Sequence, residues 1–352
     1  MTTSIPKPPV RHPALPVNTL GLTRRDYEGS LSTLCAGCGH DSITAALVRA
    51  CWELNIEPHR VAKLSGIGCS SKTPAYFLRE AHGFNSVHGR MPSVAAGANA
   101  ANRELLYIGI SGDGDSLSIG LGQFCHAIRR NLNVLYLLEN NGVYGLTKGQ
   151  FSASADIGSR AKKGEPNRQQ PIDPAVLALS LGCSFVARSF SGDKEQLVPI
   201  LKAALVHQGF AFVDVISPCV TFNDHEGSTK SYNYTRDHLR EAVDVDFVEA
   251  RSEIAVEYAE GEVTTVTMHD GSSVRLRKIG ADYDVHDRDA AYAQLRASAV
   301  NGEVLTGILH VNTASPDMHQ LENTPDASLT ALPYEVLCPG AAVLDRLMER
   351  FR

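Results

Sequence analysis

Two short polar segments near the middle of the chain hold residue types that bind a metal ion and a phosphate group. A Gly-Asp-Gly segment is centred on Asp113, and an Asn-Asn-Gly segment contains Asn141, 28 positions later (141 − 113). Carboxylate and amide oxygens are hard ligands that suit Mg²⁺, and Mg²⁺ in turn can hold a diphosphate. Glycines beside Asp113 allow a sharp turn that lets backbone N–H groups approach phosphate oxygens. The two segments together predict a Mg²⁺–diphosphate site.

The neighbouring elements must bring these two segments to one place. An apolar run over 105–110 predicts a buried strand ahead of Asp113, 116–129 predicts a crossover helix, and 134–138 predicts the next strand. The carboxyl ends of parallel strands meet at one edge of a sheet, where such folds bind ligands. The residues predicted to contribute there, through side chains, backbone or the helix N-terminus, are Gly112, Asp113, Gly114, Asp115, Asn141 and Val143.

Four cysteines lie in loops flanked by Gly, Ser or Pro. They are Cys35 and Cys38 in a CxxC, Cys69, and Cys219. Four thiolates suit either a [4Fe–4S] cluster or a structural Zn²⁺, and the spacing does not distinguish these from scattered core cysteines. The patterns around Cys51, Cys125 and Cys183 indicate core packing, and Cys338 lies in the C-terminal tail.

Alternating strand and helix signals predict an α/β fold with an open, mostly parallel sheet and helices on both faces. Residues 1–30 are predicted as an N-terminal arm and 31–236 as the main domain. Residues 237–352 are predicted as a small α+β extension, in which 264–278 alternates around Asp270-Gly271 as a hairpin does.

Composition excludes several classes of protein. Hydrophobic residues make up 43% of the 352 residues, and the net charge of −6 argues against a nucleic-acid binder. No apolar run approaches the roughly 20 residues that span a bilayer, and the Pro-rich start lacks the apolar segment of a secretory signal. Eight cysteines without an export signal indicate a reducing, cytoplasmic environment.

The string NNGVYGLTKGQ at 140–150, taken with the motifs above, resembles the thiamine-diphosphate-binding beta subunits of 2-oxoacid:ferredoxin oxidoreductases. The resemblance covers about residues 30–240 and implies a sheet of the thiamine-diphosphate-binding type, with thiamine diphosphate and Mg²⁺ bound. It also implies one [4Fe–4S] cluster on Cys35, Cys38, Cys69 and Cys219, although Ala36 stands where the family usually has proline. It adds Gly145, Leu146 and Thr147 to the expected cofactor contacts.

Four further residues are candidates for the active site because they lie near the predicted ligands. His40 follows the CxxC, Lys72 follows Cys69, and the candidates His88 and Arg90 share one loop. By the resemblance, the loop of Lys72 borders the substrate pocket, where its ammonium group could pair with a substrate carboxylate.

The resemblance implies coenzyme A-dependent oxidative decarboxylation of a 2-oxo acid, with electrons passed through the cluster to ferredoxin. It favours 2-oxoglutarate, converted to succinyl-CoA and CO₂, over pyruvate or another 2-oxo acid. No Glu has the context expected for activating the thiamine ring, so an alpha subunit should complete the site in a heterodimer or a dimer of heterodimers. A non-redox thiamine-dependent decarboxylase or synthase with a zinc site, and a non-enzymatic metal-binding subunit, remain alternatives.

Overall fold

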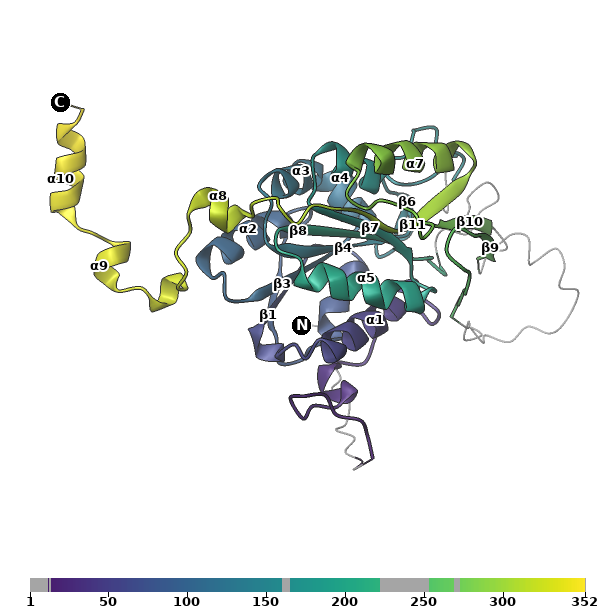
Figure 1. Ribbon diagram of the computed structural model, residues 1–352, viewed down its shortest axis with the longest axis horizontal. Helices are drawn as coiled ribbons and strands as arrows, with labels where there is room; N and C mark the ends of the chain where they lie inside the picture. The colour runs from purple at the N-terminus through teal and green to yellow at the C-terminus, as the bar shows by residue number, and fades with distance from the viewer. Residues whose placement is uncertain (1–11, 13, 160–164, 222–252, 269–272, 352) are drawn as a thin grey trace, which may run out of the picture.

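A nine-stranded sheet forms the centre of the computed structural model (Figure 1), which describes residues 12, 14–159, 165–221, 253–268 and 273–351. Its strands lie in the order β2-β1-β3-β4-β8-β7-β11-β10-β9. In chain order they are β1 (Val61–Ser65), β2 (His82–Asn85), β3 (Leu106–Gly112), β4 (Val134–Asn140), β7 (Phe185–Phe190), β8 (Phe210–Ile216), β9 (Val263–Thr267), β10 (Ser273–Lys278) and β11 (Glu303–Val311).

The direction of the strands confirms the predicted fold class. Strands β2, β1, β3, β4, β8 and β7 all run parallel. Strand β11 then pairs antiparallel with β7 and parallel with β10, and β9 pairs antiparallel with β10. The antiparallel pair β9–β10 is the predicted hairpin of the C-terminal extension, and its turn residues lie outside the described ranges. The extension therefore continues the main sheet.

Helices cover both faces of the sheet, as Figure 1 shows. In β4, Leu135 and Leu137 pack into one hydrophobic cluster, whereas Val134, Tyr136 and Leu138 pack into the other, as the alternation of side chains along a strand requires. The first cluster includes α1 (Gly39–Glu53) and α5 (Lys194–Val206). The second includes α2 (Met91–Ala101), α3 (Leu121–Arg129), α4 (Pro174–Ser180) and α7 (Arg288–Val300).

The crossover after Asp113 differs from the single helix predicted over 116–129. A π-helical segment, η4 (Gly114–Ile119), ends at Gly120, and α3 begins only after it. The Gly120 N–H donates to the carbonyl of Asp115 at 2.9 Å, five positions back. A Cβ at Gly120 would lie 2.8 Å from the Cα of Gly89, so close packing of this loop requires glycine there.

Helix α1 starts earlier than its local sequence suggests. Asp and Ser are common N-cap residues, so Asp41-Ser42 would place the helix start after it, but the helix begins at Gly39 with Cys38 as its N-cap. The backbone N–H of Gly39 donates to the carbonyl of Pro218 at 3.4 Å, which draws the helix start toward a distant loop. A contact between residues so far apart in the sequence cannot be inferred from local capping preferences.

The two ends of the described chain behave differently. Part of the predicted N-terminal arm packs on α1, because Trp52 Nε1 donates to the carbonyl of Leu22 at 3.0 Å and Asn18 Nδ2 donates to the carbonyl of Trp52 at 3.2 Å. In contrast, a C-terminal tail leads away from the sheet in Figure 1 through α8 (Met318–Glu322), α9 (Tyr334–Leu337) and α10 (Ala341–Glu349). The predicted domain boundary near 236 lies outside the described residues.

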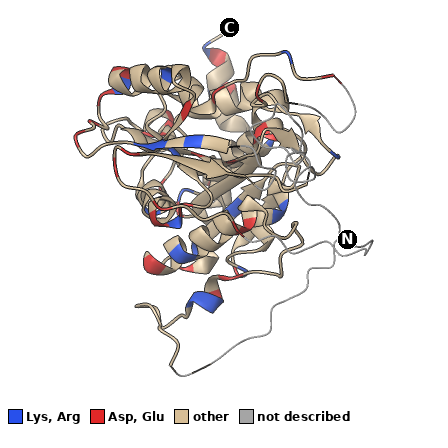
Figure 2. Cartoon of the chain, turned by 90° about the vertical axis from the view of Figure 1, so that its right-hand side faces the viewer, with Lys and Arg blue, Asp and Glu red and all other residues tan. Residues whose placement is uncertain are grey.

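Surface charge and helix length agree with the composition. In the view of Figure 2, basic and acidic residues are interspersed over the described chain. No described helix combines the length and the apolar character that crossing a membrane requires.

Candidate functional site

A pocket at the carboxyl ends of β3 and β4 brings the two polar segments together. This is the edge at which parallel sheets of this kind bind ligands. It is lined by His40, Ile67, Gly68, Cys69, Ser70, Gly112, Asp113, Gly114, Asp115, Glu139, Asn141, Val143, Tyr144 and Gly145.

Asp113 lies at the floor of this pocket with its carboxylate held by the protein. The residue is 1% exposed, and its Oδ2 accepts hydrogen bonds from the hydroxyl groups of Ser152 and, at 2.6 Å, Ser154. Its Oδ1 accepts a longer hydrogen bond, 3.4 Å, from the backbone N–H of Asn141. The carboxylate is therefore fixed in direction and lies beside the second polar segment.

Asn141 and the two residues after it form a tight turn. Gly142 has a φ of 72°, the left-handed conformation that glycine adopts without strain, as the sequence predicted for this position. The backbone N–H of Val143 donates to Asn141 Oδ1 at 3.1 Å. The Asp113 carboxylate, the Asn141 amide and the Val143 backbone thus lie together, and their hard oxygens fit the ligand preference of Mg²⁺.

Gly114 is a glycine because the Tyr144 ring packs directly on it. A Cβ at Gly114 would lie 2.5 Å from Cε1 of that ring, and Tyr144 Oη donates to the carbonyl of Gly114 at 2.8 Å. Tyr144 belongs to β5 (Val143–Tyr144), which pairs antiparallel with β6 (Gln150–Phe151). This small hairpin holds one wall of the pocket against η4.

The turn of the hairpin carries two of the residues predicted to contact the cofactor. Leu146 is 47% exposed, and Thr147 Oγ1 donates to Gln150 Oε1 at 2.5 Å. Neither lines the pocket, whereas the adjacent Gly145 does. Their predicted contacts would therefore be made at the rim, and their roles stay predictions.

Asp115 faces the pocket but its carboxylate has structural partners. Its Oδ1 accepts from the backbone N–H of Gly89 at 2.7 Å, and its Oδ2 accepts from Ser111 Oγ at 2.9 Å. A Cβ on Gly66 would lie 1.8 Å from Oδ2, so Gly66 gives the carboxylate its room. Asp115 joins three loops at the sheet edge and supports the pocket more than it offers a ligand.

His40 lies inside the pocket wall next to a buried acid. The residue is 1% exposed, its Nδ1 is 2.6 Å from Ser217 Oγ, and its Nε2 is 3.6 Å from Glu139 Oε2. Burial lowers the pKa of His40 to about 4 and raises the pKa of Glu139 well above its usual value. Burial thus favours the uncharged form of both groups, which suits an interior position.

The four loop cysteines gather on the same side of the sheet edge. Burial raises the pKa of Cys38 and raises that of Cys69 to about 11, and the neighbouring Cys219 adds to both shifts. Cys35 also adds to the shift of Cys69. Thr221 Oγ1 donates to Cys35 Sγ at 3.2 Å, which ties the first cysteine loop to the last.

These thiols are neighbours without forming a closed ligand set. Within the part of the chain that the structure describes, no three His, Cys, Asp or Glu side chains lie close enough together to hold a metal ion. The donor set itself, four thiols in Gly-, Ser- and Pro-flanked loops, has the chemistry that an iron–sulfur cluster requires. Cys51 and Cys183 are buried in the core as predicted, Cys125 is half-buried, and Cys338 is exposed.

The remaining candidates lie outside the pocket wall. Lys72 is half-buried in the short helix η3 (Ser70–Ala75), directly after Cys69. His88 and Arg90 are exposed, on the loop that Gly89 ties to Asp115. Their part in catalysis stays a prediction.

Several residues of the site were not predicted from the sequence. Ser152 and Ser154 bind Asp113 from about forty positions away, a distance at which no local pattern applies. Tyr144 lies inside a segment that was recognised, whereas Glu139 lies between two such segments. A charged residue directly after the apolar run at 134–138 was a signal that could have identified Glu139.

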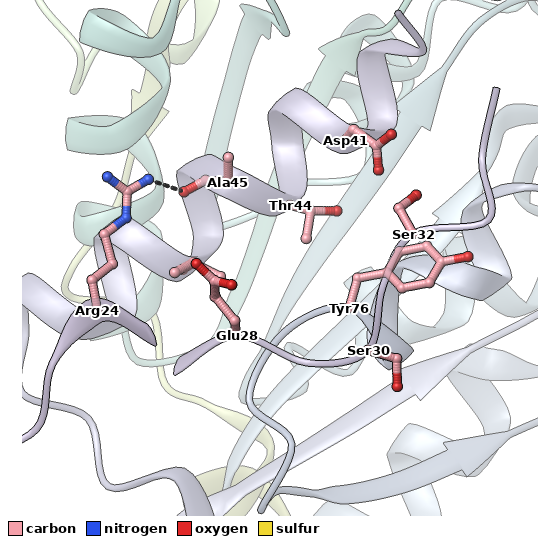
Figure 3. A pocket seen from close by; sticks show the side chains of 9 residues that line it. Arg24, Glu28, Ser30, Ser32, Asp41, Thr44, Ala45 and Tyr76 are labelled. Atoms are coloured by element: carbon pink, nitrogen blue, oxygen red, sulfur yellow. Dashed lines mark hydrogen bonds between the residues drawn. The ribbon is translucent and has the colours of Figure 1, made fainter. Parts of the chain in front are cut away.

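A second pocket contains none of the predicted site residues (Figure 3). It is lined by Arg24, Glu28, Ser30, Ser32, Asp41, Thr44, Ala45, Val48 and Tyr76. The Arg24 guanidinium bonds the carbonyl of Ala45 at 3.4 Å. This mixed-charge pocket contains neither of the two polar segments that the sequence singled out.

Comparison with known proteins covers the part of the chain that carries the site. The family described as "Thiamine pyrophosphate enzyme, C-terminal TPP binding domain" matches residues 66–215, which include both polar segments. The 2-oxoacid:ferredoxin oxidoreductase subunit beta of Saccharolobus solfataricus is 44% identical over 199 residues, which are 56% of this chain and 65% of that protein. The match thus spans slightly less than two thirds of that relative.

Two further relatives are covered more completely. The 2-oxoglutarate synthase subunit KorB of Methanocaldococcus jannaschii is 32% identical over 63% of this chain and 84% of its own length. A solved structure of 2-oxoglutarate:ferredoxin oxidoreductase from Magnetococcus marinus, with 2-oxoglutarate, coenzyme A and succinyl-CoA bound, superimposes with a TM-score of 0.67 and 30% identity. That match covers 86% of this chain and 89% of the other.

Proposed function

Because the chain belongs to the beta subunits of the 2-oxoacid:ferredoxin oxidoreductases, we propose that it binds the cofactors of an enzyme that oxidatively decarboxylates a 2-oxo acid. In the proposed reaction coenzyme A takes the acyl group, CO₂ is released, and two electrons pass to ferredoxin. The observation that carries the proposal is the pocket in which Asp113 and Asn141 meet at the carboxyl ends of β3 and β4.

The proposed substrate is 2-oxoglutarate, which would yield succinyl-CoA. Support comes from the relatives: the Methanocaldococcus protein is a 2-oxoglutarate synthase subunit, and the Magnetococcus structure contains 2-oxoglutarate and succinyl-CoA. The Saccharolobus relative is named for 2-oxo acids in general, so pyruvate or another 2-oxo acid is the competing substrate.

The chain's own residues would hold the diphosphate end of thiamine diphosphate. Asp113, the Asn141 amide oxygen and the Val143 carbonyl would bind Mg²⁺, and Gly112 and Gly114 would let the backbone approach the phosphates. When bound, thiamine diphosphate supplies the nucleophilic carbon and the electron sink for decarboxylation. The hydroxyl groups of Ser152 and Ser154 would keep the Asp113 carboxylate aimed at the metal.

The four cysteines Cys35, Cys38, Cys69 and Cys219 would hold one [4Fe–4S] cluster beside that pocket. Cys69 lines the pocket, so a cluster on these thiols would lie next to the cofactor. In a simple decarboxylase, the electron pair left after loss of CO₂ takes up a proton and becomes a carbon–hydrogen bond of the product. Here those electrons would leave through the cluster. Binding of the cluster would also draw the three cysteine loops into a closed ligand set.

A partner is expected to cover the pocket. Exposed apolar side chains lie next to it in the sequence and the structure: Val87 is 69% exposed, Ile119 45% and Leu146 47%. Val87 and Ile119 belong to segments that meet where Gly89 packs on Gly120. Apolar surface of this kind around a site fits burial by an alpha subunit, which would also supply the missing acid for the thiamine ring.

The direct test is to purify the chain anaerobically, alone and with its alpha subunit. The complex should contain about four iron and four sulfide per beta chain, and dithionite should bleach its colour. It should reduce a low-potential acceptor with 2-oxoglutarate and coenzyme A, whereas the isolated chain should not turn over. Zinc without colour would instead support a non-redox thiamine enzyme, and turnover by the isolated chain would contradict the two-subunit site.

Lys72 tests the choice of substrate. If its ammonium group binds the distal carboxylate of 2-oxoglutarate, Lys72→Met should raise KM for 2-oxoglutarate about tenfold, the cost of one charged hydrogen bond, and leave KM for pyruvate unchanged. Lys148→Met, on the hairpin turn, is the matched control and should change neither value. If Lys72→Met leaves KM for 2-oxoglutarate unchanged, a residue other than Lys72 binds the distal carboxylate of the substrate.

A further inference from the structure

Four buried polar side chains connect the cysteine loops to the end of β4. Glu139, the penultimate residue of that strand, is fully buried and accepts a hydrogen bond from Thr73 Oγ1 at 3.0 Å. His40 Nε2 lies 3.6 Å from the Glu139 carboxyl group, and His40 Nδ1 is 2.6 Å from Ser217 Oγ. Thr73 and Ser217 are as completely buried as Glu139. One continuous polar network therefore runs through the interior at this edge.

Each member of the network lies within four positions of a predicted ligand. His40 follows Cys38, Thr73 follows Cys69, Ser217 precedes Cys219, and Glu139 precedes Asn141. The three segments that carry these cysteines come from different parts of the chain, and Glu139 is at the centre of the contacts. The Glu139 carboxyl group contacts both His40 and Thr73 and so joins two of these segments.

The network is rigid for a physical reason. In an interior of low dielectric, each buried polar group needs its partner, because leaving one unpaired costs more than a solvated hydrogen bond contributes. Thr73 and His40 therefore have one favourable arrangement relative to Glu139. Since Glu139 belongs to a strand bonded on both sides, by β3 and β8, its position is set by the sheet.

Resting on the proposed function, we propose that Glu139 is a positioning residue that fixes the geometry of the cysteine loops relative to the diphosphate end of the site. It acts through His40 and Thr73, and through His40 on Ser217. Electron transfer from the thiamine cofactor to a cluster on these cysteines would depend on their separation, which a residue fixed in the sheet at this edge would help to set.

The experiment uses the complex with the alpha subunit and five variants, of which Thr73→Val is needed only if Glu139→Leu does not fold. Glu139→Leu keeps the volume but leaves His40 and Thr73 without their partner, whereas Glu139→Gln can still accept from Thr73 and donate to His40. Ser217→Ala removes only the contact on the cysteine side. Thr306→Val is the matched control. Thr306 belongs to β11, is equally buried, and its Oγ1 is hydrogen-bonded to Tyr258 Oη at 2.8 Å.

Two readouts separate positioning from general stability. They are the electron paramagnetic resonance spectrum of the reduced cluster and the affinity for thiamine diphosphate with Mg²⁺. Glu139→Leu should alter the spectrum and weaken cofactor binding about tenfold, the loss that one unpaired buried group produces. Glu139→Gln should restore both. Ser217→Ala should alter the spectrum and leave cofactor affinity within about twofold, because its contact lies on the cysteine side only.

The outcomes distinguish the inference from the function it rests on. A wild-type complex without iron or cofactor binding overturns both. A wild-type complex that binds both, with an unchanged spectrum in Glu139→Leu, overturns the positioning role alone, and so does an equal change in Thr306→Val. If Glu139→Leu does not fold, as judged by circular dichroism, an unchanged spectrum in both Ser217→Ala and Thr73→Val overturns it.

Discussion

The two ends of the proposed site differ in how far the chain alone completes them. At the diphosphate end, Asp113 is 1% exposed and its carboxylate accepts hydrogen bonds from Ser152, Ser154 and the backbone of Asn141. At the cluster end, Cys35 is exposed, and the described residues include no closed set of three metal-ligating side chains. At the same sheet edge, the chain alone therefore holds the predicted Mg²⁺ ligand in place but does not bring the cysteines into a closed ligand set.

The difference follows from what each end is made of. The diphosphate end uses side chains on or next to strands, whose positions the sheet determines, and its polar groups are paired within the protein. The cluster end uses loops from three parts of the chain, and hydrogen bonds to thiols, such as the one from Thr221 to Cys35, are weak. A bound cluster would itself supply the missing cross-links, as metals do in other small sites.

The largest expected effect separates the two ends directly. Asp113→Ala removes the charged Mg²⁺ ligand and should weaken thiamine diphosphate binding at least about 100-fold, consistent with the loss of a buried charged contact. Cys219→Ser should lower iron content and leave diphosphate binding nearly unchanged. Calorimetric titration with Mg²⁺ and thiamine diphosphate, combined with iron analysis, measures both. Loss of both properties in each variant would mean that the two ends form one cooperative unit.

Much of the fold was predictable because its signals are local. Apolar runs identified the central strands, and α5 begins after Asp193, whose side chain accepts from the Gln196 N–H at 3.1 Å. Strand β2 was missed because all its residues are exposed, so it shows no apolar alternation. The boundary of η4 was missed because it depends on Gly89 packing against Gly120, a contact between distant segments.

The residues of the site divide in the same way into those with a local sequence signal and those without one. Asp113 and Asn141 were identified from residue type and spacing, since both follow apolar strands. The residues that hold them were not, because Ser154 reaches Asp113 and also Asn140 Oδ1, at 2.9 Å, only after the chain has folded. Ligands of a motif are visible in a sequence, whereas the hydrogen bonds that orient them depend on tertiary structure.

A smaller effect tests how tightly the diphosphate end is built. Gly114→Ala would place a Cβ 2.5 Å from the Tyr144 ring, so the hairpin wall must move. Crowding of this kind costs about 1–3 kcal/mol and should weaken thiamine diphosphate binding about tenfold. Gly97→Ala, in the interior of α2 with nothing within 4 Å, is the matched control and should stabilise the protein by up to about 1 kcal/mol. Thermal unfolding and cofactor titration together distinguish the two substitutions, and equal cofactor affinity in both would show that the Tyr144 wall is not part of the site.

The smallest expected effect asks whether the protein or the metal orients Asp113. Ser154→Ala removes one donor to Asp113 and the bridge to Asn140, and should weaken thiamine diphosphate binding about threefold to fivefold, the value of one neutral hydrogen bond. Ser180→Ala, on the exposed side of α4, should change nothing. The decisive feature is the dependence on Mg²⁺. If the hydroxyl preorganises the carboxylate, the loss should be greatest at low Mg²⁺ and shrink as the metal saturates, because the metal then holds Asp113 itself. A loss that is independent of Mg²⁺ would mean that Ser154 supports the pocket wall and does not orient the Asp113 carboxylate. The hydrogen bonds to Asp113 would then contribute less to cofactor binding than their geometry suggests.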